Sequence, residues 1–383
     1  MKLNFLTHMR ETAQQLLGKG APLQRWNQRP QPAMRDINPP PADAAPPTPP
    51  QSPASTPNPA THPAEFAQDM LDRMGIKIDL QANLDRAIDV GSLLHPTPAQ
   101  PLPEGAQFIS GSYTNHAGSR NYKLYIPASY HGQAMPLLVM LHGCTQNPDD
   151  FAAGTQMNQL AEEIGCFVVY PEQTAGANHS KCWNWFNAID QQRGQGEPSI
   201  IAGIAQQIIE EYPVNERQVY VAGLSAGGAM AVIAGTLYPE LFAAVGVHSG
   251  LPFASAQDLP SALTAMKRGV NKADKAGNGA QRIIVFHGDS DTTVNPRNGE
   301  QVMAQRLHHH RGARPKVRSG AVPNGHRYTQ TTHVKPDGSP WGEHWVVHGA
   351  GHAWSGGSAS GSYTDAKGPD ASREMLRFFR TVN

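Results

Sequence analysis

The chain has 383 residues with 31 basic and 31 acidic side chains, so its formal net charge at pH 7 is zero. This balance gives no electrostatic reason to expect binding to nucleic acid or to an anionic membrane surface. No apolar stretch approaches the ~20 residues of a membrane-spanning helix, so no transmembrane segment is predicted.

The first hundred residues differ in character from the rest. Residues 1–29 form a short amphipathic segment with no continuous apolar core and no small-residue cleavage site, so no secretory signal is predicted and the expected localisation is cytoplasmic. Residues 30–63 hold 13 of the 33 prolines, which predicts a disordered or polyproline-like linker. Residues 64–104 have the pattern of a short helix followed by a surface strap. Residues 105–383 then form the predicted catalytic domain.

Strand-like and helix-like segments alternate through that domain. Apolar runs predict strands at 122–126, 136–141, 167–170, 219–222, 242–247, 282–286 and 345–347. Helices are predicted at 151–164, 199–211, after Ser225, near 298–307 and near 372–381. Apolar strands that alternate with helices indicate an α/β fold with a mostly parallel sheet covered on both faces.

The most informative segment runs from Val219 to Gly228, where an apolar strand leads into Gly-x-Ser-x-Gly and then into a helix-forming run. This is the context of a nucleophile elbow, in which a tight turn lifts the serine above the sheet. Gly223 and Gly227 provide the space that the turn requires. Ser225 is therefore the predicted nucleophile, and an ordinary serine in a glycine-rich turn is the alternative.

A serine needs a base, and the base needs an acid to orient it. The predicted strand 282–286 opens into a loop that carries two carboxylates, Asp289 and Asp291. The strand 345–347 leads to His352 in a glycine-bracketed loop. The order Ser, Asp, His is that of α/β-hydrolases, which makes His352 the predicted base.

An oxyanion hole is predicted beside the serine. The buried-type strand 136–141 ends in His142-Gly143-Cys144, and a His-Gly pair often marks the loop that provides one backbone donor. The other donor is the residue after the nucleophile. The two predicted donors are the backbone N–H groups of Cys144 and Ala226.

Five segments in this order give the chain a recognisable pattern: 141–146 (LHGCTQ), 182–186 (CWNWF), 223–228 (GLSAGG), 287–294 (HGDSDTTV) and 351–357 (GHAWSGG). Together they resemble the polyhydroxybutyrate (PHB) depolymerase family of esterases, which is related to feruloyl and acetyl-xylan esterases. The resemblance covers about residues 105–382. It implies an α/β-hydrolase fold and a triad of Ser225, Asp291 and His352, and it prefers Asp291 to Asp289 because of the spacing to Val294.

The resemblance also bears on the cysteines and tryptophans. It implies a disulfide between Cys144 and Cys182, with two reduced thiols as the alternative, whereas Cys166 is predicted to be a small core residue. The residues Trp183, Trp185 and Trp354 lie in loops expected at the catalytic mouth, so they are predicted to bind substrate, and the alternative is that they brace these loops.

The sequence thus predicts a serine esterase whose partner is an ester substrate: a polyester, an oligomer or an aryl ester. Polyhydroxybutyrate-type polyesters or oligomers and short-chain esters are expected first, although the sequence has no obvious polymer-binding domain. A feruloyl- or acetyl-xylan-type carbohydrate esterase is the alternative, followed by a catalytically silent binding protein. Extracellular localisation is the alternative that the resemblance suggests.

No metal and no cofactor are predicted. His344 and His348 are four residues apart in a strand-like run, which puts them about 13 Å apart, too far for one ion.

Overall fold

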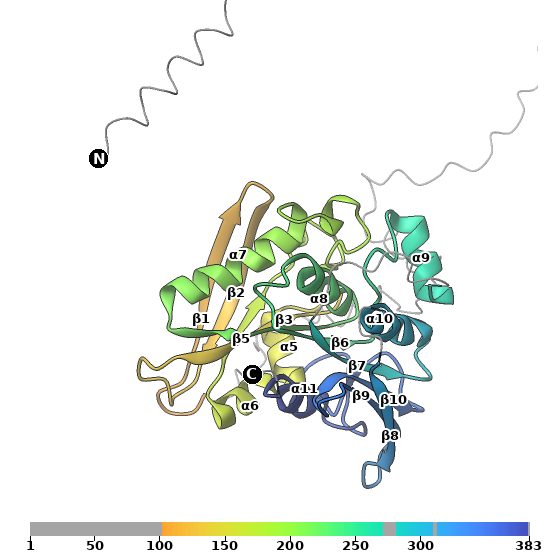
Figure 1. The fold of residues 1–383 in the computed structure, drawn as a ribbon. Helices are drawn as coiled ribbons and strands as arrows, with labels where there is room; N and C mark the ends of the chain where they lie inside the picture. Colours follow the sequence, from red (N-terminus) through yellow and green to blue (C-terminus); the bar gives the residue numbers. More distant parts are fainter. Residues whose placement is uncertain (1–101, 271–280, 309–311, 382–383) are drawn as a thin grey trace, which may run out of the picture. The chain divides into compact units, whose positions relative to one another are not determined.

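The computed structural model describes residues 102–270, 281–308 and 312–381 (Figure 1). The predicted amphipathic segment 1–29, the proline-rich linker 30–63 and all but the last three residues of 64–104 lie outside the described residues. Across the described part of the chain, every helix is too short or too polar to span a membrane.

A mixed sheet forms the centre of the described domain (Figure 1). In these residues it has ten strands in the order β1-β2-β4-β3-β5-β6-β7-β10-β9-β8. Their bounds are β1 Gln107–Asn115, β2 Gly118–Ile126, β3 Met135–Leu141, β4 Phe167–Pro171, β5 Val214–Leu224, β6 Ala244–His248, β7 Arg282–Gly288, β8 Arg314–Ala321, β9 Arg327–Val334 and β10 Pro340–His348. A separate parallel pair joins β11 Trp354–Ser355 to β12 Thr364–Asp365.

The middle of the sheet is parallel, from β4 through β3, β5, β6 and β7 to β10. Both margins are antiparallel, β1 and β2 on one side and β9 and β8 on the other. Three of these strands were not predicted from the sequence: β1, β8 and β9. Residues of β8 are almost all exposed, so this strand lacks the apolar pattern by which buried strands are predicted.

Helices cover both faces, as predicted. The cluster that contains α7 Gly196–Glu211, α8 Ala226–Leu237, α9 Leu259–Arg268 and α10 Arg297–Leu307 packs on one face. The other face is covered by α5 Pro148–Thr155, α6 Met157–Ile164 and α11 Ala371–Phe379. A short 3-10 helix, η1 Ile189–Gln191, precedes α7. This is the architecture of an α/β-hydrolase, with a mostly parallel sheet between two helical layers.

One helix was predicted as continuous but is interrupted in the structure. The run 151–164 forms two helices, because Gln156 between them has a left-handed backbone with φ 53°. At 100° per residue, a continuous helix that buries Phe151 and Thr155 would turn Met157 and Leu160 away from the core. The break restores them to the buried face, where Met157 is fully buried.

Candidate active site

Ser225 lies in a strained turn between β5 and α8. Its backbone has φ 56° and ψ −118°, outside the regions that non-glycine residues favour. A Cβ on Gly223 would lie 2.4 Å from the Gly227 backbone, and one on Gly227 would lie 2.1 Å from the Leu141 carbonyl oxygen. The Ser225 N–H donates to the His248 carbonyl at 2.9 Å. The turn therefore has the geometry of the predicted elbow, and the adjoining backbone fixes it.

Two backbone donors are available beside this turn. Ala226 is the first residue of α8, so its N–H has no acceptor one turn back along the helix. The Cys144 N–H donates to no other described residue. The end of β3 contacts the start of α8, since a Cβ on Gly227 would lie 2.5 Å from the His142 carbonyl oxygen. Both predicted oxyanion donors thus lie in segments that pack against each other.

Asp291 and His352 are brought together from the ends of β7 and β10. His352 Nδ1 donates to Asp291 Oδ2 at 2.7 Å. The other oxygen, Oδ1, accepts from the backbone N–H groups of Thr293 at 2.9 Å and Val294 at 2.8 Å. These bonds fix the orientation of the carboxylate, and Nε2 of His352 has no hydrogen-bond partner among the described residues.

A second imidazole contacts the same carboxylate. His287 Nε2 lies 2.9 Å from the Val294 carbonyl oxygen and 3.4 Å from Asp291 Oδ2, so its proton is shared between them. Burial alone would raise the pKa of Asp291, but the hydrogen bonds from His287 and His352 outweigh it and hold the pKa well below its usual range. The carboxylate is therefore charged at neutral pH.

His248, the last residue of β6, links the serine turn to the histidine loop. Its carbonyl accepts from Ser225, and its Nε2 accepts from the Ser355 N–H at 3.0 Å. Its ring stacks on Trp354, with 5.2 Å between ring centroids. Burial, with His287 and His352 nearby, lowers the pKa of His248 to about 3, so the ring is neutral and Nε2 can accept.

Within the described residues, the Ser225 hydroxyl makes no hydrogen bond, so the contact with His352 that acyl transfer requires is not formed in this state. Catalytic hydrogen bonds are often loose without substrate and tighten when it binds. The His352 side chain remains 13% exposed, while the Asp291 side chain is fully buried and only 6% of that whole residue is exposed. Ser225 is also partly exposed, so solvent reaches the serine and the base but not the side chain of the acid.

Asp289, the other carboxylate of the predicted acid loop, contacts His348 and Gly349 and makes no hydrogen bond to His352 in the described residues. It accepts from His348 Nδ1 at 2.8 Å and from the Gly349 N–H at 2.7 Å. The side chains of His348 and Asp289 are 42 and 41% exposed. Asp289 fixes the end of β10, whereas Asp291 contacts the base.

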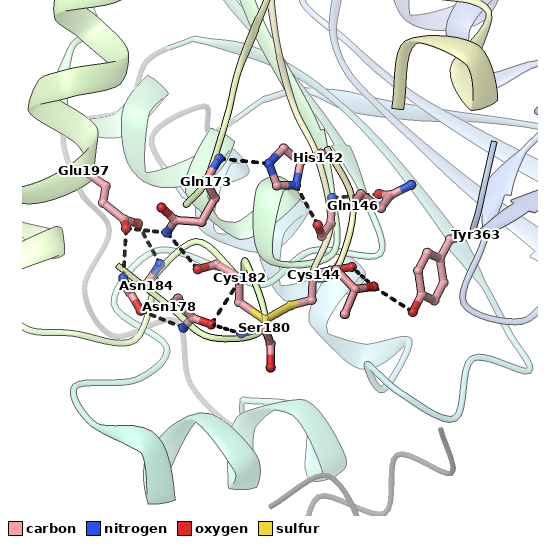
Figure 2. Close-up of a disulfide and its surroundings, with 12 residues drawn as sticks. His142, Cys144, Gln146, Gln173, Asn178, Ser180, Cys182, Asn184, Glu197 and Tyr363 are labelled. Atoms are coloured by element: carbon pink, nitrogen blue, oxygen red, sulfur yellow. Dashed lines mark hydrogen bonds between the residues drawn. A yellow bond between two sulfur atoms is a disulfide. The ribbon is translucent and has the colours of Figure 1, made fainter. Parts of the chain in front are cut away.

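The cysteine pair is bridged. Cys144 and Cys182 form a disulfide that joins the loop after β3 to the loop after β4 (Figure 2). Beside it, Thr145 Oγ1 and the Tyr363 hydroxyl lie 3.1 Å apart. Cys166 is the fully buried core residue that was predicted.

Gln146 forms further hydrogen bonds between loops, which were not predicted from the sequence. Its Oε1 accepts from the Gly143 N–H at 2.9 Å, and its Nε2 donates to Asp150 and to the Ser362 carbonyl. The loop that carries Cys144 is thus held to the β11–β12 region. The contact of His287 with Asp291 was also not predicted. His287 lies in the 287–294 motif, but the motif does not indicate which atom its ring contacts.

The predicted substrate contacts of the tryptophans are wrong. Trp183, Trp185 and Trp354 are 0, 4 and 1% exposed and belong to the two core clusters. Trp183 packs on His142, and Trp354 packs on Phe151 and donates to Ser372 Oγ at 3.0 Å. Their apolar rings gain more by filling the space under these loops than by facing solvent, so they brace the loops.

Residues 120–321 match the family described as Esterase PHB depolymerase, which is more than half of the chain. The chain belongs to the PHB depolymerase family of esterases. It is 32% identical over 256 residues to poly(3-hydroxyalkanoate) depolymerase C of Paucimonas lemoignei, a match that covers 64% of this chain and 60% of that protein. It is 29% identical over 210 residues to acetylxylan esterase A of Talaromyces purpureogenus, which covers 50% of this chain and 54% of that protein.

Among solved structures, the acetyl xylan esterase from Aspergillus awamori matches with a TM-score of 0.55 and 19% identity, over 72% of this chain and 99% of that chain. This likeness shows a shared fold. The chain spans about 60% of the length of the depolymerases that it matches.

Proposed function

We propose that this chain is a serine carboxylic ester hydrolase that works through an acyl-enzyme, with Ser225 as nucleophile, His352 as base and Asp291 as the acid that orients it. The observation that carries the proposal is the 2.7 Å bond between His352 Nδ1 and Asp291 Oδ2, which leaves Nε2 as the ring nitrogen available to Ser225 in a side chain that is 13% exposed. The strained backbone of Ser225 also supports the proposal, because the hydrogen bond from the Ser225 N–H to the His248 carbonyl holds this turn in place.

The proposed mechanism follows from these positions. His352 Nε2 takes the Ser225 hydroxyl proton while Oγ attacks the ester carbonyl carbon. The resulting oxyanion accepts hydrogen bonds from the Cys144 and Ala226 N–H groups, for which the described residues provide no competing acceptor. His352 then gives its proton to the departing alcohol, and a water molecule activated by His352 hydrolyses the acyl-enzyme. Asp291 stays ionised and stabilises the imidazolium that forms in each step.

The proposed substrates are soluble 3-hydroxybutyrate oligomers and short-chain esters. The depolymerase relatives support the hydroxyalkanoate. Large exposed apolar side chains in the described residues are few and scattered: Leu102, Ile109, Ile189 and Val317. Ile109 on β1 and Val317 on β8 lie at opposite margins of the sheet. This scatter gives no contiguous apolar surface for a solid polyester in these residues, so oligomers are preferred.

A carbohydrate esterase is the second candidate, because the relatives include acetylxylan esterases at 29% identity. A panel of 3-hydroxybutyrate dimer and trimer, p-nitrophenyl acetate, methyl ferulate and acetylated xylan separates the two. The highest kcat/KM among natural-type esters is expected on the hydroxybutyrate trimer, and S225A is expected to cleave none of them. A clear preference for acetylated xylan or methyl ferulate would overturn the substrate assignment.

We also propose that the chain acts in an oxidising compartment, the alternative to the cytoplasmic localisation expected from its first residues. The Cys144–Cys182 disulfide supports this, because structural disulfides persist outside the reducing cytosol. Maleimide labelling of denatured protein from fractionated cells should find one thiol per chain, at Cys166. Three thiols in a cytosolic fraction would contradict it.

A further inference from the structure

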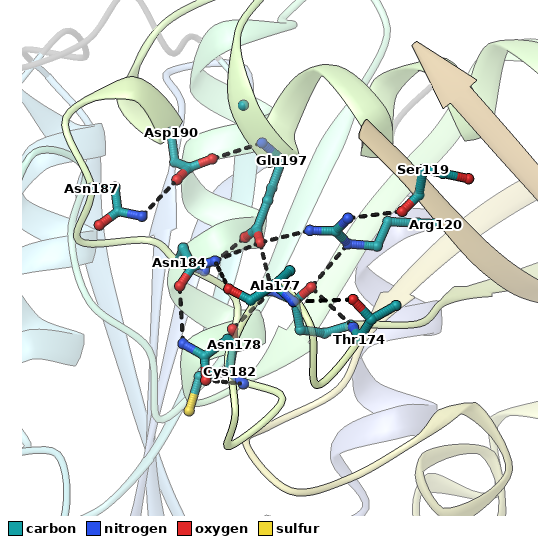
Figure 3. Close-up of polar contacts among 12 residues, drawn as sticks. Ser119, Arg120, Thr174, Ala177, Asn178, Cys182, Asn184, Asn187, Asp190 and Glu197 are labelled. Atoms are coloured by element: carbon teal, nitrogen blue, oxygen red, sulfur yellow. Dashed lines mark hydrogen bonds and ion pairs between the residues drawn. The ribbon is translucent and has the colours of Figure 1, made fainter. Parts of the chain in front are cut away.

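Glu197 is a buried carboxylate that the proposed chemistry does not use. It lies in the first turn of α7 and its side chain is 6% exposed. It accepts from Arg120 Nη2 at 3.1 Å, from Gln173 Nε2 at 2.5 Å, and from the Asn184 backbone and side-chain nitrogens at 2.7 and 2.8 Å (Figure 3). Four bonds to one buried carboxylate offset part of its desolvation and hold its two oxygens in place.

Gln173 connects this carboxylate to the loop that carries Cys144. Its Oε1 accepts from Arg120 Nε at 2.9 Å, and its Nε2 donates to the Cys182 carbonyl at 2.8 Å. Its backbone N–H donates to His142 Nε2 at 3.0 Å (Figure 2). The His142 ring then donates from Nδ1 to the Gly143 carbonyl at 2.7 Å, so the chain of contacts ends at the residue before Cys144.

Asn184 provides a second route to the same loop. It is bonded to Asn178, whose Oδ1 accepts from the N–H groups of Ser180 and Cys182. The Ser180 carbonyl accepts from the Thr145 N–H at 2.7 Å, and Cys182 is bridged to Cys144. The two routes therefore reach both neighbours of Cys144, Gly143 and Thr145, and Cys144 itself.

We propose that Glu197 is the positioning residue for the oxyanion donor at Cys144. The inference rests on the proposed function, in which the Cys144 N–H binds the oxyanion. An oxyanion donor is effective only when it is fixed where charge develops, before substrate arrives. Glu197 achieves this by holding Gln173 and Asn184, each of which holds one side of the Cys144 loop.

The α7 helix does not depend on Glu197 for its own position. Ile200, Ile204 and Ile208 are fully buried against the sheet and anchor the helix through apolar contacts. What depends on Glu197 is the polar loop from Gln173 to Asn184. Loss of the carboxylate should therefore impair the oxyanion site more than it lowers the stability of the fold.

The variant E197Q tests this proposal, because the amide keeps the shape and loses the charge that Arg120 and the N–H donors require. With p-nitrophenyl acetate, kcat should fall roughly 10- to 100-fold, less than the ~10²–10³-fold loss of an entire oxyanion donor. KM should stay within about threefold. The inhibition constant of a trifluoromethyl ketone, which forms an oxyanion in the same place, should rise by the same factor by which kcat/KM falls.

The matched control is I208A on the same helix, which removes buried apolar contact without touching the network. It should lower the Tm and leave kcat and the trifluoromethyl ketone affinity near the native values at 25 °C. Native kcat and inhibitor affinity in E197Q would overturn the proposal, and so would an equal kcat loss in I208A. If E197Q does not fold, R120K takes its place: it keeps the charge, loses the guanidinium fork and should show the same linked losses.

The disulfide allows a further test of the proposal. C182S removes one tether of the Cys144 loop and leaves the Glu197 network, so the double variant should lose more kcat than the product of the two single losses. A purely multiplicative result would mean that the two act on different elements, against the proposal. Activity in S225A would instead overturn the proposed function, so the two failures are distinguishable.

Discussion

The two aspartates of the acid loop have the same charge and lie two residues apart, but their surroundings give them different roles. Asp291 is 6% exposed and contacts the base, while Asp289 is exposed and holds His348. D291N should lower kcat by about 10⁴-fold, because the amide cannot hold the His352 tautomer that places the free nitrogen toward Ser225. D289N should lower kcat less than tenfold. Steady-state kinetics on p-nitrophenyl acetate decides, and a larger loss in D289N would show that the acid is misassigned.

His287 also contacts the Asp291 carboxylate, through its Nε2. Its Nδ1 is buried and has no hydrogen-bond partner in the described residues. A Cβ on Gly299 would lie 2.8 Å from that nitrogen, so the ring fills its space closely. H287L removes the shared proton and should lower kcat roughly tenfold, the scale of one charge-assisted hydrogen bond, with KM unchanged. Native kcat in H287L, measured on the same ester, would mean that the two backbone N–H groups suffice to orient Asp291.

At the scale of elements, the elbow depends on contacts between backbones. G227A should fail to fold or lose more than about 4 kcal/mol of unfolding free energy, because its Cβ would overlap the Leu141 carbonyl at the end of β3. G351A is the control, since a Cβ there meets nothing within 4 Å and the change should stay within about 0.5 kcal/mol. Urea unfolding measures both. A stable G227A would show that β3 and α8 are not packed as described.

The parallel core of the sheet could be predicted from the sequence because its strands contain apolar runs, as in 136–141 and 283–286. The positions of Ser225, Asp291 and His352 at strand ends followed from their order in the chain. The strands β8 and β9 could not be predicted in this way: β8 is almost entirely exposed, β9 is mostly half-buried, and both carry mainly polar residues. Their pairing with β10 depends on tertiary contacts that leave no periodic signal.

The buried polar network around Glu197 could also not be predicted from the sequence. Glu197 follows Gly196 in a run that predicts only a helix start, and Arg120 is 77 residues away in β2. The same limit explains the tryptophans, because proximity to a catalytic loop in sequence does not say whether a ring points into the site or beneath it. Only the packing of Trp183 on His142 and of Trp354 on His248 distinguishes the two.

For the whole molecule, three buried histidines predict a loss of stability in mild acid. Burial lowers the pKa values of His142 and His344 to about 4 and that of His248 to about 3, against about 6.5 in an unfolded chain. Between pH 6.5 and 4 the unfolded chain therefore binds protons that the folded chain does not. Stability is fully present above pH 6.5 and falls as the pH drops, by up to about 1.4 kcal/mol per pH unit for each histidine.

Burial raises the pKa values of Glu197 and Asp190, and these two carboxyls act in the opposite direction, so the observed slope should be smaller than the sum for three histidines. Urea unfolding at pH 7, 6 and 5, followed by tryptophan fluorescence, should show a free energy of unfolding that decreases at each step. A free energy that is constant or increases over this range would contradict the neutral state of these rings.

The central claim is that Ser225 is a nucleophile activated by His352. A fluorophosphonate probe tests it directly, because it reacts with an activated serine hydroxyl without any assumption about the natural ester. Peptide mapping by mass spectrometry should place one phosphonyl group per chain on Ser225, and labelling should be lost in S225A and strongly slowed in H352A. Absence of label on Ser225 in the folded native protein, or labelling at the same rate in H352A, would contradict the account.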